Sequence, residues 1–461
     1  MIPYRSIEKQ TFLKGEMIMR RTHVLSILLI GTIGLAGCNG NLQNNEHPAG
    51  NQTNGNGSDN ENGSDLETFG DSDPEVELSF WLFGANYDSL VEEYVEENPN
   101  IAINIQQIDM GDHHNNLFTS LSAGSGAPDM AAIEVSEIDT YKTAEDQFVN
   151  LYDLGAEEIE DDYLNWVWDI GTSVDGDFLF GIPTDIGPTV MYYRADVFEE
   201  AGLPTEPEEV EELIQTWEDY GEAAEQILEE TGKPISDNPE MVYNAKRDQS
   251  PEQYFNENDE LIIDEAPYVK DAFYDTAEWI EKDYIINHGM WSPEWGSAMS
   301  DGSYATLLGP AWMRDTIKDN APDETNWRIA QMPGGAGNWG GSWVTIPEQS
   351  DHPEEAYEFL KWLLAPEQQM RSFEERGMFP STPDVYEKEA FVTITDDYYG
   401  GQNVGEIFAE AALDVQHVHK GAQYGDVNAE IVSGLDNVYD GTDPDEEWED
   451  ILNRVDQRIS R

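Results

Sequence analysis

The chain has 461 residues, of which 95 are acidic and 23 are basic, so its formal net charge is -72. Hydrophobic residues make up 39% of the sequence, which is enough for more than one hydrophobic core. A chain this acidic lacks the basic patches that neutralise phosphate, and we expect it to bind no nucleic acid. We interpret the charge as a surface kept hydrated in salty or alkaline surroundings, because net charge bears on solubility and not on fold.

The N-terminus carries the pattern of an export signal. Arg20 and Arg21 precede the apolar run 24–35, which ends in small residues. A basic region, a short apolar region and a small-residue cleavage site are typical of a signal peptide. The run is too short for a bilayer-spanning helix, which needs roughly 20 apolar residues. Residues 1–16 fit no such pattern, so we expect translation to begin at Met17 or Met19.

Cys38 is the only cysteine in the chain, which excludes an intrachain disulfide and the usual cysteine-based zinc sites. Residues 35–38, Leu-Ala-Gly-Cys, resemble the lipobox of bacterial lipoproteins. The resemblance implies cleavage after residue 37, a lipid on Cys38 and a protein anchored on the outer face of the cell membrane. Residues 38–74 are predicted to be a disordered tether, because Asn, Gly, Ser, Asp and Glu dominate them.

Strands and helices alternate in the first part of the folded chain. Apolar and alternating runs predict strands over 76–83, 101–105 and 130–133, and helical periodicity predicts helices over 89–97 and 115–123. This alternation is typical of a parallel α/β sheet with helices on both faces. A tight-turn sequence at 175–177 predicts a hairpin, and a further strand is expected over 189–193.

The later half of the chain is richer in helices. We predict helices over 207–230, 266–282, 353–364 and 366–376, the last of which ends at Gly377. No internal repeat is visible, so the two halves of the chain are not copies of one unit.

A series of short motifs, in order along the chain, resembles family 1 extracellular solute-binding proteins, the maltose-binding-protein-like group. The motifs are Trp81 at the end of the first strand, Gly-Ala-Pro-Asp-Met at 126–130, Phe-Gly-Ile-Pro at 180–183, Tyr-Tyr-Arg-Ala-Asp-Val-Phe at 192–198, Gly-Pro-Ala-Trp at 309–312 and Pro-Glu-Gln-Gln at 366–369. Arg194 departs from the asparagine usual in that family. The likeness extends from about residue 76 to the C-terminus.

The resemblance implies an α/β protein with two lobes, a hinge and a ligand cleft between the lobes. We place lobe one at 75–184 plus 309–348 and lobe two at 185–308 plus 349–461. It further implies a monomer that captures a sugar or oligosaccharide and hands it to the permease subunits of an ABC importer.

A neutral sugar offers flat apolar ring faces and hydroxyl groups, so its site needs aromatic side chains and polar acceptors. Of the 13 tryptophans, those beside strand ends or Gly- and Pro-rich turns have less core to enter. We expect the segment around Ser292-Pro293-Glu294 to be a loop with a tryptophan on either side. The predicted ligand-binding tryptophans are Trp81, Trp291, Trp295, Trp312, Trp339 and Trp343.

Glu134 and Asp185 are the predicted ligand-binding carboxylates. Glu134 follows the third strand and Asp185 follows Pro183, and open α/β sheets bind ligands at the carboxyl ends of their strands. Asn86, which follows the first strand, is a further candidate, as are Asn338 and Arg376.

The sequence carries no catalytic motif of a serine hydrolase, zinc peptidase, P-loop nucleotidase or dinucleotide-binding enzyme. We therefore predict no catalytic residue, cofactor or metal, and expect His113, His114, His417 and His419 to be exposed. Two alternatives stay open: a secreted carbohydrate-active enzyme on the same anchor, and a binding protein for a non-sugar solute such as a peptide or polyamine.

Overall fold

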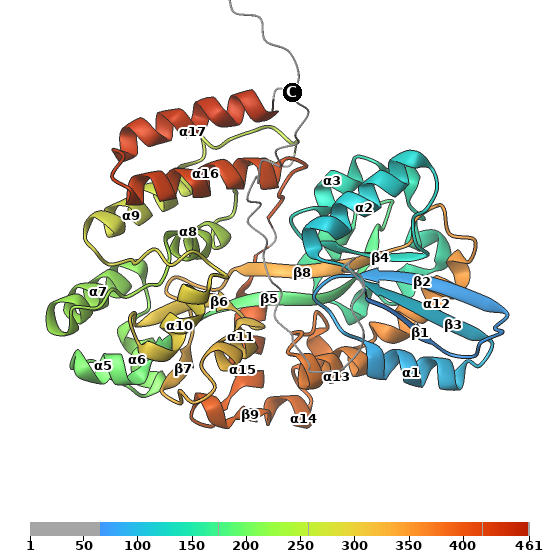
Figure 1. The fold of residues 1–461 in the computed structure, drawn as a ribbon, viewed down its shortest axis with the longest axis horizontal. Helices are drawn as coiled ribbons and strands as arrows, with labels where there is room; N and C mark the ends of the chain where they lie inside the picture. Colours follow the sequence, from blue (N-terminus) through green and yellow to red (C-terminus); the bar gives the residue numbers. More distant parts are fainter. Residues whose placement is uncertain (1–64, 174, 257, 417, 460–461) are drawn as a thin grey trace, which may run out of the picture. The chain divides into compact units, whose positions relative to one another are not determined.

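The computed structural model describes residues 65–173, 175–256, 258–416 and 418–459 (Figure 1). Chain contacts place all of these described residues in one compact unit. The predicted signal peptide, Cys38 and the first part of the predicted tether lie outside the described residues. No helix among the described residues is long and apolar enough to cross a bilayer.

One sheet connects most of the strands, in the order β1-β3-β2-β4-β8-β5-β6, with β7 also paired to β5. Strands β2, β3 and β4 are parallel, and β8 runs antiparallel to both β4 and β5. The predicted α/β fold and its first three strands are confirmed. The strands are β1 (Asp65–Phe69), β2 (Val76–Leu82), β3 (Ile101–Gln107), β4 (Met130–Glu134), β5 (Gly181–Arg194), β6 (Thr306–Pro310), β7 (Trp327–Ala330) and β8 (Asn338–Thr345).

Helices cover both faces of the sheet in its N-terminal part. Figure 1 shows α2 and α3 on one face of β2–β4, and α1 and α12 on the other. Helix α2 begins where the Asp109 carboxylate accepts a hydrogen bond from the Gly111 amide, and it ends at Gly124 in the left-handed region. The helices of this part are α1 (Asp88–Glu97), α2 (Met110–Ala123), α3 (Ile138–Lys142) and α4 (Asn165–Gly171).

The predicted helix over 207–230 is two helices, α6 and α7. The chain breaks because Thr216 and Asp219 form a capping box that starts α7 at Trp217. The other three predicted helices of this half are confirmed. Its helices are α5 (Ala195–Glu200), α6 (Pro207–Leu213), α7 (Trp217–Thr231), α8 (Pro239–Asp248), α9 (Pro267–Glu281), α10 (Pro293–Asp301), α11 (Met313–Asn320), α12 (Pro353–Leu363), α13 (Pro366–Arg376), α14 (Glu389–Val392), α15 (Val404–Asp414), α16 (Tyr424–Tyr439) and α17 (Pro444–Ile459).

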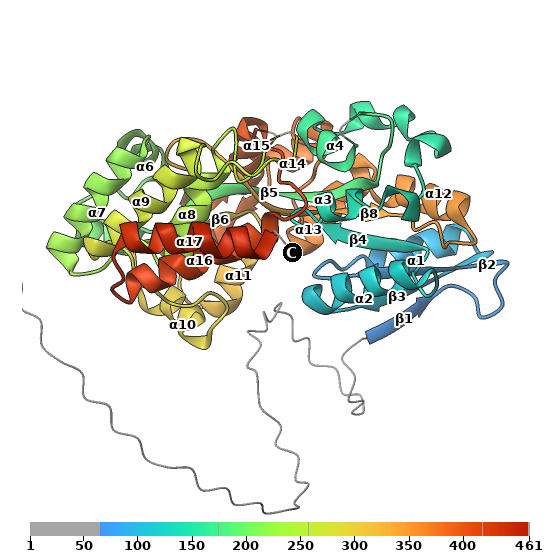
Figure 2. The ribbon, with the colours of Figure 1, turned by 90° about the horizontal axis from the view of Figure 1, so that it is seen from above.

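Strand β5 runs from one hydrophobic cluster to another. Ile182, near its start, packs with the side chains of β2, β3 and α1, which we call the β2–β3 cluster. Met191 and Tyr193, near its end, pack with α5 and α7, the α5–α7 cluster. A third cluster joins α8, α9, α16 and α17, whose layering is visible in Figure 2. Strands β5 and β8 are therefore the crossings between the β2–β3 cluster and the rest of the chain.

Two assignments to the predicted lobes differ from this packing. Residues 309–330 were placed in lobe one, but β6 and β7 pair with the second half of β5. Helix α12 was placed in lobe two, but Tyr357, Phe359 and Leu360 belong to the β2–β3 cluster. The chain returns to the first strands through β8, which pairs with both β4 and β5, and Gly309 and Pro310 lie in β6. The remaining lobe boundaries stay predictions.

The predicted tether extends too far towards the C-terminus. Residues Asp65–Phe69 form strand β1, which pairs antiparallel with β3 from Asp65 opposite Gln107 to Phe69 opposite Ile103. The segment has a polar composition, and Leu66 and Phe69, three residues apart, give no alternating pattern, so its strand conformation comes from pairing with the open edge of β3.

Candidate ligand-binding site

Glu134 and Asp185 meet across strand β8. Glu134 is the last residue of β4 and lies opposite Ser342 of β8. On the other side of β8, Asp185 of β5 also lies opposite Ser342. The backbones of β8 and β5 approach each other closely here. A Cβ added to Gly341 would lie 2.8 Å from the Asp185 carbonyl oxygen, and Gly341 has a positive φ of 106°. The sheet thus brings together the two carboxylates that the sequence analysis selected.

Both carboxyl groups have a raised pKa because they are buried. Burial raises the pKa of Asp185 to about 6, against the opposing effect of the Thr184 hydroxyl, which donates a hydrogen bond to Asp185 Oδ1 at 2.6 Å. Burial also raises the pKa of Glu134, although Ser136 donates hydrogen bonds to Glu134 Oε2 from its amide (2.6 Å) and its hydroxyl. Repulsion from Glu134 contributes to the raised pKa of Asp185, so the two groups interact electrostatically.

Four predicted tryptophans form one contiguous aromatic group. Trp291 stacks on Trp312 with ring centroids 6.0 Å apart and an interplanar angle of 22°. Trp312 contacts Trp339 at 5.5 Å, and Trp291 contacts Trp295 edge-on at 5.2 Å. Trp291, Trp312 and Trp339 are half-buried, so part of each ring stays accessible. Of these residues Trp339 lies on β8, the strand that also carries Ser342 between the two carboxylates.

Trp295 and Trp343 are interior side chains. Trp295 lies in helix α10, not in the predicted loop, since Ser292 caps that helix through its hydroxyl. It is 1% exposed, and its indole N–H donates to Asp237 Oδ2 at 2.6 Å. Trp343 is also 1% exposed and donates to the Val167 carbonyl at 3.2 Å. Burial of this extent leaves no ring face for a ligand, so Trp295 supports the ring of Trp291 and Trp343 packs the core.

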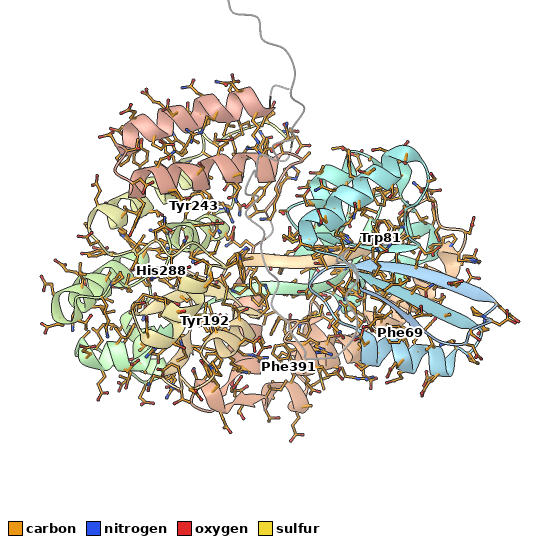
Figure 3. All side chains as sticks on the ribbon, in the orientation of Figure 1. Phe69, Trp81, Tyr192, Tyr243, His288 and Phe391 are labelled. Carbon is orange, nitrogen blue, oxygen red and sulfur yellow. The ribbon has the colours of Figure 1, made fainter. Side chains whose placement is uncertain are left out.

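Trp81 lies towards the end of β2 (Figure 3). It is half-buried and meets the ring of His113 at 6.5 Å. His113 was expected to be exposed, but it is fully buried and donates from Nε2 to the Ala132 carbonyl at 2.7 Å. Burial lowers the pKa of His113 to about 4 and makes the neutral ring the stable form.

The remaining polar candidates, Asn86, Asn338 and Arg376, form hydrogen bonds with each other or with the backbone. Asn86 and Arg376 contact each other, with Arg376 Nη2 donating to Asn86 Oδ1 at 3.2 Å. Asn338 accepts from the Gly187 amide at 2.8 Å and donates to the Gly340 carbonyl at 2.8 Å, which fixes the crossing of β5 and β8. These contacts occupy the amide groups, and none of them joins the two carboxylates.

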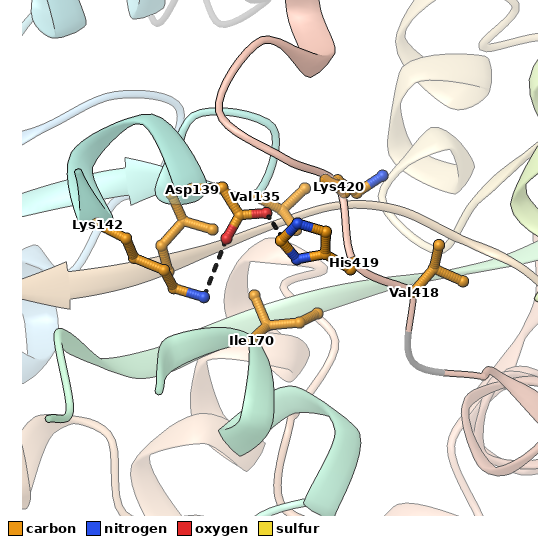
Figure 4. A pocket seen from close by; sticks show the side chains of 8 residues that line it. Val135, Asp139, Lys142, Ile170, Val418, His419 and Lys420 are labelled. Atoms are coloured by element: carbon orange, nitrogen blue, oxygen red, sulfur yellow. Dashed lines mark ion pairs between the residues drawn. The ribbon is translucent and has the colours of Figure 1, made fainter. Parts of the chain in front are cut away.

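A cluster of charged side chains that no sequence pattern predicted joins α3 to the segment around His419. Asp139 forms an ion pair with Lys142 at 3.0 Å and lies 3.8 Å from His419 Nδ1 (Figure 4). With Val418 and Lys420, they line a small pocket. About 280 residues separate Asp139 from His419, and no local pattern signals such a contact. Among the described residues no group of three or more His, Cys, Asp or Glu side chains is arranged to hold a metal ion.

The family model for bacterial extracellular solute-binding proteins matches residues 89–397. The chain belongs to the bacterial extracellular solute-binding proteins. This confirms the family that the sequence motifs indicated, and it places the protein among extracellular binding proteins.

This solute-binding protein has relatives of known name. It is 30% identical over 370 residues to an arabinooligosaccharide-binding protein of Halalkalibacterium halodurans, covering 76% of this chain and 81% of the relative. It is 29% identical to the protein of the same name from Bacillus subtilis, covering 75% and 83% of the two chains. A crystal structure of an extracellular solute-binding protein of family 1 is 35% identical, with a TM-score of 0.79 over 83% of this chain and 99% of that chain.

Proposed function

We propose that this solute-binding protein captures a neutral sugar or oligosaccharide outside the cell and delivers it, chemically unchanged, to an ABC importer. The observation that carries the proposal is the aromatic group Trp291–Trp312–Trp339, of which Trp339 lies on β8, the strand between Glu134 and Asp185. Half-buried indole rings offer faces for sugar rings to stack on, and the two carboxylates accept hydrogen bonds from sugar hydroxyls.

The relatives support a sugar ligand more than a peptide or polyamine. Two of them are named for arabinooligosaccharides, and each aligns over three-quarters or more of this chain. A binding role without turnover fits both the family and the site. A glycosidase needs one carboxylic acid and one carboxylate placed on either side of a scissile bond. Here strand β8 lies between the strands that carry Glu134 and Asp185. Burial raises the pKa of both residues, so the pair does not divide into one acid and one carboxylate.

A thermal-shift screen of the purified protein against neutral sugars tests the proposal. A ligand at 100 times its Kd stabilises the folded state by roughly 2.7 kcal/mol, so a true ligand raises the Tm clearly. Arabinotriose is the first sugar to test, followed by arabinose, lactose and maltotriose. A peptide mixture and spermidine are the controls. A Tm that rises with spermidine or peptides, and with no sugar, would contradict the proposal.

We also propose that Cys38 is lipidated and anchors the protein to the membrane. The support is the lipobox-like sequence 35–38 and the absence of any other cysteine. Cell fractionation checks this: wild-type protein is expected in the membrane fraction and Cys38→Ala in the medium. Equal membrane retention of both would disprove the anchor and leave the sugar proposal standing.

A further inference from the structure

Backbone groups of the segment 418–422 form hydrogen bonds with side chains of α3. The Gly421 amide donates to Asp139 Oδ2 at 2.8 Å, and the Thr140 hydroxyl donates to the Ala422 carbonyl at 2.7 Å. Asp139 and Thr140 follow directly on β4 and Glu134, so the segment is held beside one of the two proposed ligand carboxylates.

The same segment is fastened on its other side as well. His419 Nε2 lies 2.7 Å from Asp259 Oδ1, and Tyr424 at the start of α16 belongs to the α8–α9–α16–α17 cluster. A Cβ on Gly421 would lie 2.7 Å from the Phe255 ring, so the backbone is pressed against that cluster. Contacts from both sides fix the position of the one residue between His419 and Gly421, which is Lys420.

Lys420 presents its ammonium group without a hydrogen-bonding partner among the described residues. Its Nζ lies over the Tyr424 ring, 4.3 Å from the centroid, a cation–π contact that leaves the N–H groups unused. Figure 4 shows Lys142 and His419 turned towards Asp139, whereas the Lys420 ammonium points away from it. Lys142, by contrast, is engaged in its ion pair with Asp139.

Charges of both signs act on Lys420. Asp248, Glu134 and Asp139 attract its ammonium and Arg247 repels it, and among the described residues no acid forms an ion pair with Nζ within 4.0 Å. Burial lowers the pKa of Lys420 in spite of these acids, so its ammonium is not fully solvated. Val135, the residue after Glu134, lines the same small pocket as Lys420, which places the two charged residues near each other. Since neither is paired with the other, a group that accepts from Lys420 and donates to Glu134 joins them.

We propose that Lys420 is a further ligand-binding residue, which donates a hydrogen bond to a sugar hydroxyl whose own proton is directed at Glu134. A hydroxyl is both donor and acceptor, so it satisfies both side chains at once, whereas an ether or a carboxylate does not. Arg247 is paired with Asp248, and Lys142 with Asp139. Glu134 and Asp185, which form no ion pair among the described residues, therefore outweigh the charge of Lys420, so the site disfavours a uronic acid. This inference rests on the proposed function and assigns a residue and a charge preference to the same site.

The test compares Lys420→Met and Lys420→Gln with Lys142→Met by isothermal titration with arabinotriose. Hydrogen bonds to charged groups contribute roughly 1.5–3 kcal/mol, equivalent to about a 10- to 100-fold change in Kd. We expect Lys420→Met to weaken binding by that factor and Lys420→Gln, which keeps a neutral donor, to weaken it less. Lys142→Met is the matched control from the same pocket and is expected to bind as wild type. Wild-type protein is expected not to bind galacturonic acid trimers.

The outcomes separate the two claims. If wild-type protein binds no neutral sugar, the proposed function fails. If it binds arabinotriose and both Lys420 variants bind equally well, the function stands and the role of Lys420 is overturned. The Tm of each unliganded variant is measured alongside. If Lys420→Met does not fold, Lys420→Gln alone decides, and wild-type affinity in that variant overturns the inference. Tight binding of the uronic acid would overturn the charge preference.

Discussion

Asp185, a proposed ligand-binding residue, lowers the free energy of unfolding of the unliganded protein when it is ionised. Its pKa of about 6 lies above the ordinary value of 3.8, because burial disfavours the carboxylate. The folded state therefore holds the proton more tightly than the unfolded state. The contribution of Asp185 to the free energy of unfolding is therefore greatest below pH 4 and is lost as the pH rises through about 6. Above that range the ionised side chain costs about 3 kcal/mol, from roughly two pK units at 1.36 kcal/mol each.

Replacing Asp185 by Asn is expected to stabilise the unliganded protein above pH 6 and to weaken sugar binding. The amide keeps the acceptor oxygen for the Thr184 hydroxyl but carries no charge. Urea unfolding at pH 8 should give a free energy of unfolding up to about 3 kcal/mol higher than wild type, and the difference should vanish near pH 4. Asp323→Asn, an exposed position, is the control. A variant less stable than wild type at pH 8 would show that the carboxylate is compensated in the folded state.

Trp312→Ala is expected to weaken sugar binding while the empty protein stays folded. Trp312 lies between Trp291 and Trp339 in the aromatic group, so its loss removes the central stacking surface. We expect a loss of about 1 kcal/mol or more, roughly fivefold in Kd, measured by quenching of tryptophan fluorescence.

The matched control is Trp362→Ala, a half-buried tryptophan of α12 that packs on Tyr94 at 5.1 Å. Trp448 is unsuitable because it is 2% exposed and lies in the core. If Trp362→Ala weakens binding as much as Trp312→Ala, the aromatic group is not the ligand platform.

At the residue scale, sequence position identified some site residues and failed for others. Glu134 was expected just after the third strand and Asp185 in a crossover; Glu134 ends β4, Asp185 lies within β5, and both lie opposite Ser342 of the antiparallel strand β8. Trp295 was wrongly predicted to bind ligand and Lys420 was not predicted at all, because their partners Asp237 and Tyr424 are contributed by other segments of the chain. Burial and long-range contacts, which a single sequence does not display, decide these roles.

At the scale of elements, periodicity identified most helices and strands, and local chemistry explains the exceptions. The break between α6 and α7 comes from the Thr216–Asp219 capping box, which a helical run of Glu residues masked. Strand β1 was missed because its pairing partner, β3, lies more than 30 residues away. A short polar segment becomes a strand only where an open edge supplies its hydrogen bonds.

Strand β1 is expected to stabilise the fold, so a chain beginning at Glu75 should be less stable than one beginning at Asp65. The truncation removes the ladder from Asp65 opposite Gln107 to Phe69 opposite Ile103 and leaves the edge of β3 unpaired. Net hydrogen-bond contributions of about 0.5–1.5 kcal/mol suggest a loss on the order of 1–3 kcal/mol, measured by urea unfolding. The longer chain serves as the control. Equal stability of the two chains would mean that β1 is dispensable.

At the scale of the whole molecule, β5 and β8 carry both the fold and the site. Strand β5 contributes to both the β2–β3 cluster and the α5–α7 cluster, β8 pairs with it, and the two strands carry Asp185, Ser342 and Trp339. A ligand bound there touches elements that pack in different cores, which is the arrangement that hinge closure requires. The resemblance predicted the fold class and two lobes correctly in kind. It assigned 309–330 and α12 to the wrong cores, because motifs give the order of segments and not their packing.

The most direct test of the account is titration of the purified protein with arabinotriose, followed by chromatography of the recovered sugar. The account predicts saturable binding at one site per chain, with a change in tryptophan fluorescence and quantitative recovery of intact trisaccharide after long incubation. Shortening of the trisaccharide at a rate proportional to protein concentration would contradict it and point to an enzyme. Binding of neither arabinotriose nor any other neutral sugar would contradict it as well.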